Sequence, residues 1–136
     1  MKKNADGRTR SKYGNTAVPS TKMLDRFTHG KQFRSKLEFN HALWLLSECQ
    51  AKRVKTWEYE KQYDLVVDGK TVCAIVPDFT VILPDNRVEV HEIKSPATKT
   101  AEWRIKSKLF CILYPHIRYR LFESGFERKP SVIQWD

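Results

Sequence analysis

Residues 76–94 have the sequence VPDFTVILPDNRVEVHEIK, in which two largely apolar runs flank Pro84-Asp85-Asn86. Pro, Asp and Asn favour turns, so the segment predicts two antiparallel strands joined by a tight hairpin. With this turn in the middle, Asp78 on the first strand lies directly opposite Glu92 on the second. Cross-strand partners share a face of the sheet, and so do residues two apart on one strand, which adds Lys94. The other members of this face predict an apolar floor: Val76, Thr80, Ile82, Val88 and Val90.

Two helices are predicted, one on each side of this hairpin in the sequence. The first begins at Ser35, and its apolar residues recur at helical spacing: Leu37, Phe39, Ala42, Leu43, Leu45, Leu46 and Cys49. Thr100 is a suitable N-cap for the second helix, which ends before Pro115. Its predicted apolar stripe consists of Ile105, Leu109, Ile112 and Leu113.

Further strands complete the predicted sheet. Residues 57–67 alternate between apolar and polar side chains, as a half-buried strand does, and Asp68-Gly69 predicts a tight turn into a strand at 71–75. A last strand is predicted where Ile117, Tyr119 and Leu121 alternate with arginines. The order helix, three or four strands, helix, strand predicts an α/β domain.

A chain of 136 residues, 40% of them hydrophobic, suits one domain with a real core. We divide it into a basic mobile arm at 1–30, a folded domain at 31–124 and a C-terminal tail at 125–136. No run approaches the roughly 20 apolar residues of a membrane span, and no secretory signal is recognisable, so we expect a cytoplasmic protein. The three cysteines and four histidines fit neither a disulfide framework nor a zinc pattern, so any metal would need oxygen ligands.

The net charge of +9 is concentrated at the start of the chain. Residues 1–36 hold ten Lys or Arg against two Asp, a net charge of +8, whereas the rest is almost neutral. Such an arm can bind a polyanion by releasing counterions from a phosphate backbone, without reading base sequence. A solubilising or unstructured tail is the alternative, and composition leaves both readings open.

Two carboxylates held side by side repel each other, so each resists ionisation. A divalent cation removes this cost, and Mg²⁺ prefers carboxylate oxygens while keeping several waters. Asp78 and Glu92 are therefore predicted to bind Mg²⁺ or Mn²⁺, with the Ile93 carbonyl as a candidate further ligand. The metal would acidify a water and neutralise charge on a phosphate, and Lys94 would orient that water or stabilise the oxyanion.

The residues Pro77-Asp78, followed by Glu92-Ile93-Lys94, resemble the defining motif of the PD-(D/E)xK nuclease superfamily. The resemblance covers roughly residues 33–123. It implies a restriction-endonuclease-like αβββαβ core, with a mixed central sheet flanked by helices. The size of the chain, the FRSKLE start at 33–38 and the PDF element at 77–79 look similar to small phage proteins of the endonuclease and Holliday junction resolvase-like branch. The long gap between Asp78 and Glu92 is within the hairpin lengths that the family tolerates.

The resemblance also implies roles for residues on the two helices. The family commonly uses an acidic residue of the first helix as a further metal ligand, and Glu38 matches that position. Ser35-x-x-Glu38 is also a capping box, which would turn the acid toward the helix start, so ligand and cap both stay open. The family's second helix often supplies phosphate contacts, for which the candidates are Arg104, Lys106 and Lys108. Arg34 and Lys36 are predicted to be phosphate contacts or solvated charges.

Simpler explanations exist for the motif, because Pro-Asp with a distant Glu-x-Lys also occurs by chance. Asp78 after Pro77 would also suit a turn, and Glu92 with Lys94 would suit an exposed cross-strand ion-pair edge. Neither explains why all three share a face with valines. His91 is predicted on the opposite face and is not assigned as a general base.

These features predict a Mg²⁺-dependent endodeoxyribonuclease that hydrolyses branched or duplex DNA in a phage-infected or prophage-bearing bacterium. Small nucleases of this kind often dimerise, because cutting both strands needs two sites, so a homodimer is expected. Phage replication, recombination or packaging proteins are further candidate partners. The alternative is a non-catalytic DNA-binding or complex-assembly protein on a nuclease-like fold, and a third possibility is an RNA-directed nuclease.

Overall fold

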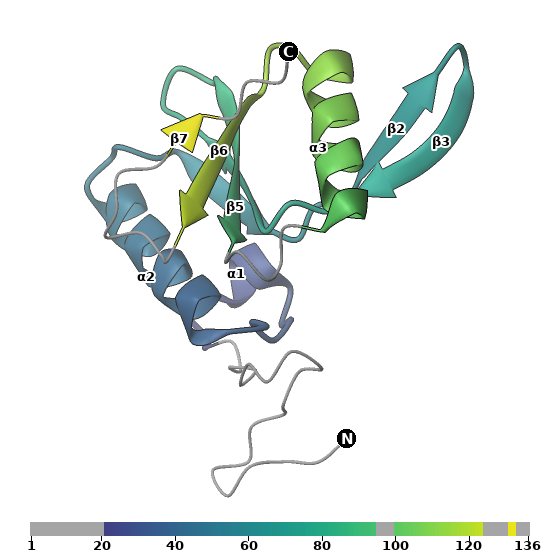
Figure 1. Ribbon diagram of the computed structural model, residues 1–136. Coiled ribbons are helices and arrows are strands. Elements are labelled where there is room, and N and C mark those ends of the chain that lie inside the picture. The colour runs from purple at the N-terminus through teal and green to yellow at the C-terminus, as the bar shows by residue number, and fades with distance from the viewer. Residues whose placement is uncertain (1–20, 95–99, 124–130, 133–136) are drawn as a thin grey trace, which may run out of the picture.

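The computed structural model describes residues 21–94, 100–123 and 131–132 (Figure 1). Its helices and strands, in chain order, are α1 (Asp25–Thr28), α2 (Lys36–Gln50), β1 (Thr56–Tyr59), β2 (Tyr63–Val67), β3 (Lys70–Ile75), β4 (Phe79–Ile82), β5 (Val88–Lys94), α3 (Ala101–Leu113), β6 (Arg118–Glu123) and β7 (Ser131–Val132). Within these residues, five strands form one sheet in the order β1-β4-β5-β6-β7, and β2 pairs with β3 separately. The α/β class with a mixed sheet is therefore confirmed.

The β4–β5 hairpin has the register that the sequence predicts. Phe79 pairs with His91, and Ile82 pairs with Val88. The pairing continues toward the turn, where the Leu83 amide donates to the Arg87 carbonyl at 2.9 Å. Asn86 has a φ of 69°, a left-handed conformation that Asn tolerates better than most residues. Asp78 immediately precedes β4, and the same register places it opposite Glu92 on β5.

The sheet is mixed because its strands are connected in two ways. β1 and β4 run antiparallel, as do β4 and β5, whereas β5 and β6 run parallel. A parallel pair needs a long crossover, and α3 supplies it between β5 and β6. Figure 1 shows α2 and α3 on opposite faces of the sheet.

Each face of the sheet has its own hydrophobic core. Phe79 and Val81 point toward α2, whereas Val90 points toward the α3 side, as alternation along strands requires. The cluster on the α2 face contains Leu24, Phe27, Phe33, Ala42, Leu45, Val54, Trp57, Tyr59, Phe79 and Val81. The cluster on the α3 face contains Tyr63, Leu65, Ile75, Val90, Trp103, Phe110, Ile117, Tyr119 and Leu121. The central strands are thus buried on both sides.

Both long helices begin at the predicted capping residues. The Ser35 hydroxyl accepts from the Glu38 amide at 3.2 Å, and the Thr100 hydroxyl accepts from the Trp103 amide at 3.1 Å. Each cap satisfies a backbone donor that the first helical turn leaves without a partner.

The predicted apolar stripes of the helices are partly wrong. Ile105 and Ile112 are 69% and 64% exposed, and α3 instead buries Trp103, Ser107 and Phe110. On α2, Leu37 and Leu43 are exposed, and the buried face includes Glu38 and His41. Helical spacing offers several faces of similar apolarity, and packing of the large aromatic rings against the sheet selects among them.

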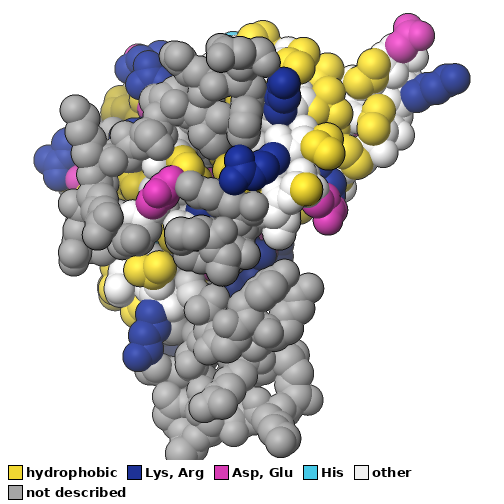
Figure 2. Space-filling view, viewed as in Figure 1, with side chains coloured by type: hydrophobic (Ala, Val, Ile, Leu, Met, Phe, Trp, Pro, Cys, Tyr) yellow, Lys and Arg dark blue, Asp and Glu magenta, His cyan; other side chains and the backbone are white. Residues whose placement is uncertain are grey.

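Residues 57–67 form two strands rather than one. Glu60 has a φ of 56° and interrupts the run, after which β2 leaves the main sheet to pair with β3. Asp68 and Gly69 both have positive φ values, 52° and 76°, which confirms the predicted tight turn. The resulting hairpin projects past α3 (Figure 1). Figure 2 shows hydrophobic side chains gathered on this hairpin. The exposed hydrophobic residues of β2 and β3 are Val66, Val67 and Val72.

Two segments outside the predicted 31–124 domain take part in the fold. Leu24 and Phe27, which the sequence places in the arm, are buried in the core of the α2 face. Phe27 stacks on Trp57 with ring centroids 4.3 Å apart. In the predicted tail, Ser131–Val132 pairs with β6 as β7. Residues 1–20 of the arm and residues 125–130 and 133–136 of the tail lie outside the described residues.

No helix in the described part of the chain has both the length and the apolar character that crossing a membrane requires.

Candidate metal and catalytic site

Asp78 and Glu92 meet where β4 begins and β5 nears its end. The Asp78 amide donates to Glu92 Oε2 at 3.1 Å, and Asp78 Oδ2 accepts from the Ile93 amide at 2.7 Å. Both side chains are buried, with relative exposures of 2% and 3%. Two acids predicted to face each other are thus held in place by the backbone of the hairpin.

The second oxygen of Glu92 is held from the α3 side. Glu92 Oε1 accepts from the Tyr119 hydroxyl at 2.8 Å and from Trp103 Nε1 at 3.2 Å. Trp103 Nε1 also lies 3.0 Å from the Tyr119 oxygen, which closes a small network. Burial and the neighbouring Asp78 charge raise the pKa of Glu92 well above its usual range. An added positive charge near Glu92 would therefore stabilise its ionised form.

Lys94 lies beside this pair. Its Nζ is 5.1 Å from the centre of the Trp103 ring, a cation–π contact. Its positive charge favours the ionised form of Glu92 and so opposes the rise in the pKa of that acid. Trp103 therefore holds both the acid and the amine of the predicted motif.

Glu38 is both part of the capping motif and part of the site. Its amide donates to Ser35 Oγ, and its Oε1 accepts from the Tyr59 hydroxyl at 2.7 Å. The side chain is buried, and burial followed by the charge of Asp78 raises the pKa of Glu38 to about 7. A role in the helix cap and a place among the acids of the site therefore do not exclude each other. The role of Glu38 as a metal ligand stays a prediction.

Arg34 bridges the acids from the segment that leads into α2. Its guanidinium pairs with Asp78 Oδ1, with Glu38 Oε1 at 3.6 Å and with Glu60 Oε2 at 3.7 Å. From the sequence alone, Arg34 is predicted only as a phosphate contact or a solvated charge. Its position four residues before Glu38 was the available signal, because residues at that spacing interact near a helix start.

The other predicted phosphate contacts do not join these acids. Arg104 and Lys108 are exposed on α3, and Lys106 pairs with Glu102 at 2.9 Å on the same helix. Lys36 is exposed at the start of α2. These cations lie on outer helix surfaces, where a bound polyanion would have access to them.

The predicted apolar floor is wrong at one end. Val90 is fully buried, but Val76 is 39% exposed. Val76 lies between β3 and β4, where the chain returns from the projecting hairpin. Thr80 is buried, with its hydroxyl 2.9 Å from that of Tyr63.

His91 lies on the opposite face, as predicted. Its Nδ1 is 3.0 Å from His41 Nε2, and its Nε2 is 3.1 Å from Glu89 Oε1. Burial lowers the pKa of His91, and both histidines are enclosed beside the α2 core. This network is separated from Asp78 and Glu92 by the sheet.

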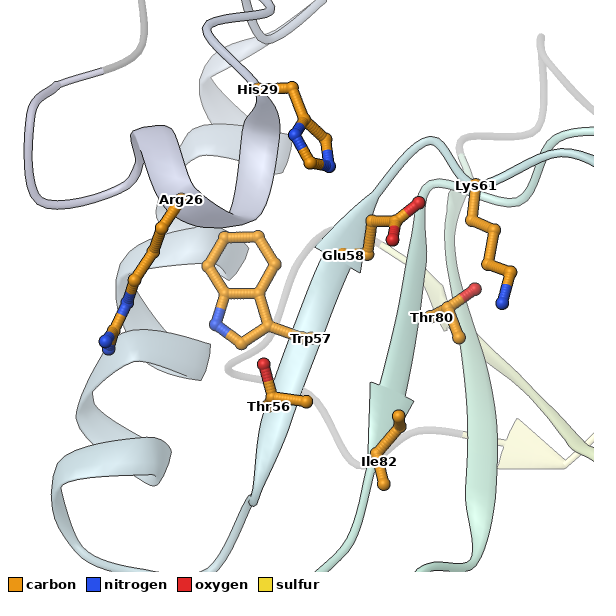
Figure 3. A pocket seen from close by; sticks show the side chains of 8 residues that line it. All are labelled: Arg26, His29, Thr56, Trp57, Glu58, Lys61, Thr80 and Ile82. Carbon is orange, nitrogen blue, oxygen red and sulfur yellow. The ribbon is translucent and has the colours of Figure 1, made fainter.

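A shallow pocket lies at the outer edge of β1, where the Trp57 ring stands between that strand and α1 (Figure 3). Its lining residues are Arg26, His29, Thr56, Trp57, Glu58, Lys61, Thr80 and Ile82. None of the four predicted catalytic side chains is among them. The pocket is therefore separate from the predicted catalytic side chains.

The donor set fits Mg²⁺ in kind, since it offers the carboxylates of Asp78, Glu92 and Glu38 and the Ile93 carbonyl. Within residues 21–94, 100–123 and 131–132, however, no three His, Cys, Asp or Glu side chains are grouped so that they could hold a metal ion. The contacts of the acids explain why they are not grouped around a common point. Arg34 lies between Glu38 and Asp78, and Glu92 is turned toward Tyr119 and Trp103. A metal would have to replace part of these internal partners.

A lower stability at alkaline pH is expected from Glu38. The folded protein holds the Glu38 proton up to about pH 7, whereas an unfolded chain releases it near 4.5. The protonated Glu38 side chain therefore makes its full contribution to stability below about pH 4.5, and this contribution is lost as the pH rises through about 7. We expect Glu38 to lower the melting temperature in EDTA between about pH 4.5 and about pH 7, whereas the buried His41 and His91, whose pKa values are lowered, contribute in the opposite direction.

Glu38→Gln should make this fall smaller, because the amide does not titrate. Glu58→Gln on β1 is the matched control and should keep the pH dependence of the unchanged protein. Thermal unfolding followed by circular dichroism measures both. Equal pH dependence of the melting temperature in the unchanged protein and in Glu38→Gln would contradict the expectation.

The chain matches no protein-family model, no curated protein and no solved structure in the three comparisons with known proteins.

Proposed function

We propose that this protein is a metal-dependent endonuclease of the PD-(D/E)xK type that hydrolyses phosphodiester bonds in DNA. One observation carries the proposal: Asp78 and Glu92 are buried together at one end of the interior strands β4 and β5, where the Asp78 amide donates to the Glu92 carboxylate, with Lys94 and Glu38 beside them. Burying like charges together is costly, so such a cluster indicates a functional site rather than a stabilising one.

The element order supports the finer assignment to a restriction-endonuclease-like core. If the β2–β3 hairpin is treated as an insertion, α2 is followed by β1, β4, β5, α3 and β6. This is the αβββαβ order that the motif resemblance implies. The motif residues lie on β5 and immediately before β4, on the hairpin at the centre of that order.

In the proposed reaction, each side chain has a role set by its contacts. Asp78, Glu92 and Glu38, with the Ile93 carbonyl, would hold Mg²⁺ or Mn²⁺. The ion would supply Lewis acidity and charge neutralisation at the phosphate. Lys94, oriented by the Trp103 ring, would place its ammonium near the attacked phosphate and stabilise its developing negative charge.

DNA would be held mainly through its phosphates. Arg104 and Lys108 are exposed on α3, and residues 1–20, outside the described structure, add further positive charge. Contacts of this kind give salt-dependent affinity with little base specificity. The homodimer stays a prediction, and so do the phage replication, recombination or packaging partners.

The test is a cleavage assay on linear, nicked, branched and single-stranded DNA, with matched RNA, in Mg²⁺ and in EDTA. We expect cuts in DNA with Mg²⁺ and none in EDTA, with binding retained in EDTA. Mapping the cuts would identify the substrate structure. Binding without cuts in either Mg²⁺ or Mn²⁺ would contradict the proposal, and cleavage of RNA alone would transfer it to an RNA-directed nuclease.

A second candidate is a non-catalytic DNA-binding or complex-assembly protein on the same fold. The observation in its favour is that the acids already have internal partners, with Arg34 paired to Asp78. In that case the cluster would be structural, and divalent metal would change neither stability nor DNA binding.

A further inference from the structure

We propose that Arg34 is a built-in counter-ion that occupies the acidic site and must leave Asp78 before a divalent cation can bind. The inference rests on the proposed function, since it assumes that Asp78 and Glu38 bind metal. It adds a controlling residue that the motif does not contain.

The geometry of Arg34 is that of a cation shared by several acids. One guanidinium contacts Asp78, Glu38 and Glu60, which belong to three separate segments of the chain. Arginine keeps its charge at all relevant pH values, and its planar group presents several donors at once. Arg34 therefore supplies the positive charge that a buried acidic cluster needs.

The oxygen that Arg34 occupies is the one a metal would need. Asp78 Oδ2 already accepts from the Ile93 amide, so Oδ1 is the oxygen that this amide leaves available to a cation. Arg34 Nη2 contacts that same Oδ1. A metal ion that bound Asp78 through Oδ1 would meet the guanidinium at close range, and the two positive charges would repel each other.

Arg34 can leave without unfolding the domain. Its side chain is 57% exposed, whereas those of Glu38 and Asp78 are 9% and 3% exposed. It also precedes the N-cap Ser35, so rotating its side chain toward solvent disturbs neither the cap nor the core. Once displaced, the guanidinium would stand at the rim of the site, where a DNA phosphate is expected.

Metal affinity in the absence of DNA tests this inference. The full chain is titrated with Mn²⁺ by calorimetry, using the unchanged protein, Arg34→Gln and the control Arg53→Gln. Arg53 makes a comparable ion pair with Glu48, away from the acidic cluster. We expect Arg34→Gln to bind Mn²⁺ about tenfold more tightly and Arg53→Gln to bind it like the unchanged protein.

Stability gives a second readout. In EDTA, Arg34→Gln should melt at a lower temperature than the unchanged protein, because its acids lose their counter-ion. Added Mn²⁺ should then raise the melting temperature of Arg34→Gln by more than it raises that of the unchanged protein. If Arg34→Gln fails to fold in EDTA, Arg34→Lys, which keeps the charge but not the bridging fork, should show tighter Mn²⁺ binding than the unchanged protein.

The outcomes separate the two proposals. Equal or weaker Mn²⁺ binding by both Arg34 variants, with clear binding by the unchanged protein, would overturn the counter-ion role and leave the metal site standing. If neither the unchanged protein nor the Arg34 variants bind Mn²⁺, both the metal site and the counter-ion role are overturned.

Discussion

Replacing Asp78 by asparagine is expected to reduce DNA cleavage in Mg²⁺ on the order of a thousandfold, while DNA binding in EDTA stays nearly unchanged. Asparagine keeps the shape of the side chain but removes the charge that would bind the cation. Asp78 is 2% exposed, and the Ile93 amide sets the position of its carboxylate. Cleavage rates on a plasmid or branched substrate, measured beside filter binding in EDTA, test the expectation.

The fold should survive this change. Removing one of several adjacent buried negative charges relieves repulsion on Glu92 and Glu38, whose pKa values Asp78 raises. Asp85→Asn is the matched control, because Asp85 is an exposed turn residue that pairs with Arg87. It should cleave like the unchanged protein. Unaltered cleavage by Asp78→Asn would remove the basis of the proposed nuclease function.

Phe27→Ala is expected to lower the free energy of unfolding by about 3 kcal/mol, although the sequence places residue 27 in a mobile arm. The ring is 3% exposed and stacks on Trp57, with a centroid separation of 4.3 Å and an interplanar angle of 8°. Its removal leaves a cavity in the core that also contains Leu24 and Phe79. Urea unfolding in EDTA, which keeps metal binding out of the measurement, gives the free energy.

Met23→Ala serves as the control for this segment. Met23 is 64% exposed, so its truncation should change the free energy of unfolding by no more than about 0.5 kcal/mol. A Phe27→Ala protein as stable as Met23→Ala would mean that the segment before residue 31 contributes nothing to the domain. The large difference expected between the two would place the start of the folded unit at or before Phe27.

Local patterns were sufficient where neighbouring residues decide the structure. The β4–β5 register followed from the turn at Pro84-Asp85-Asn86 and from strand alternation, and both are properties of a single short segment. The helix starts followed from Ser35 and Thr100 for the same reason. That register also brought Asp78 and Glu92 together before any tertiary information was used.

Patterns were insufficient where the partner lies far along the chain. The exposure of Ile105 and the division of residues 57–67 into β1 and β2 depend on which surfaces pack together. In the site, Arg34 reaches Asp78 across 44 positions, and Tyr119 reaches Glu92 across 27. No spacing rule connects residues so far apart.

The sequence by itself therefore determined the two caps, the central hairpin and the pairing of its two acids, because turn chemistry and strand alternation act over a few residues. Only the tertiary structure decided the surroundings of those acids: Glu38 turned inward onto Tyr59, Arg34 placed between two carboxylates, and Trp103 holding Glu92 and Lys94. These contacts arise when segments distant in the sequence pack together, and the burial that results is what shifts the pKa values of the acids.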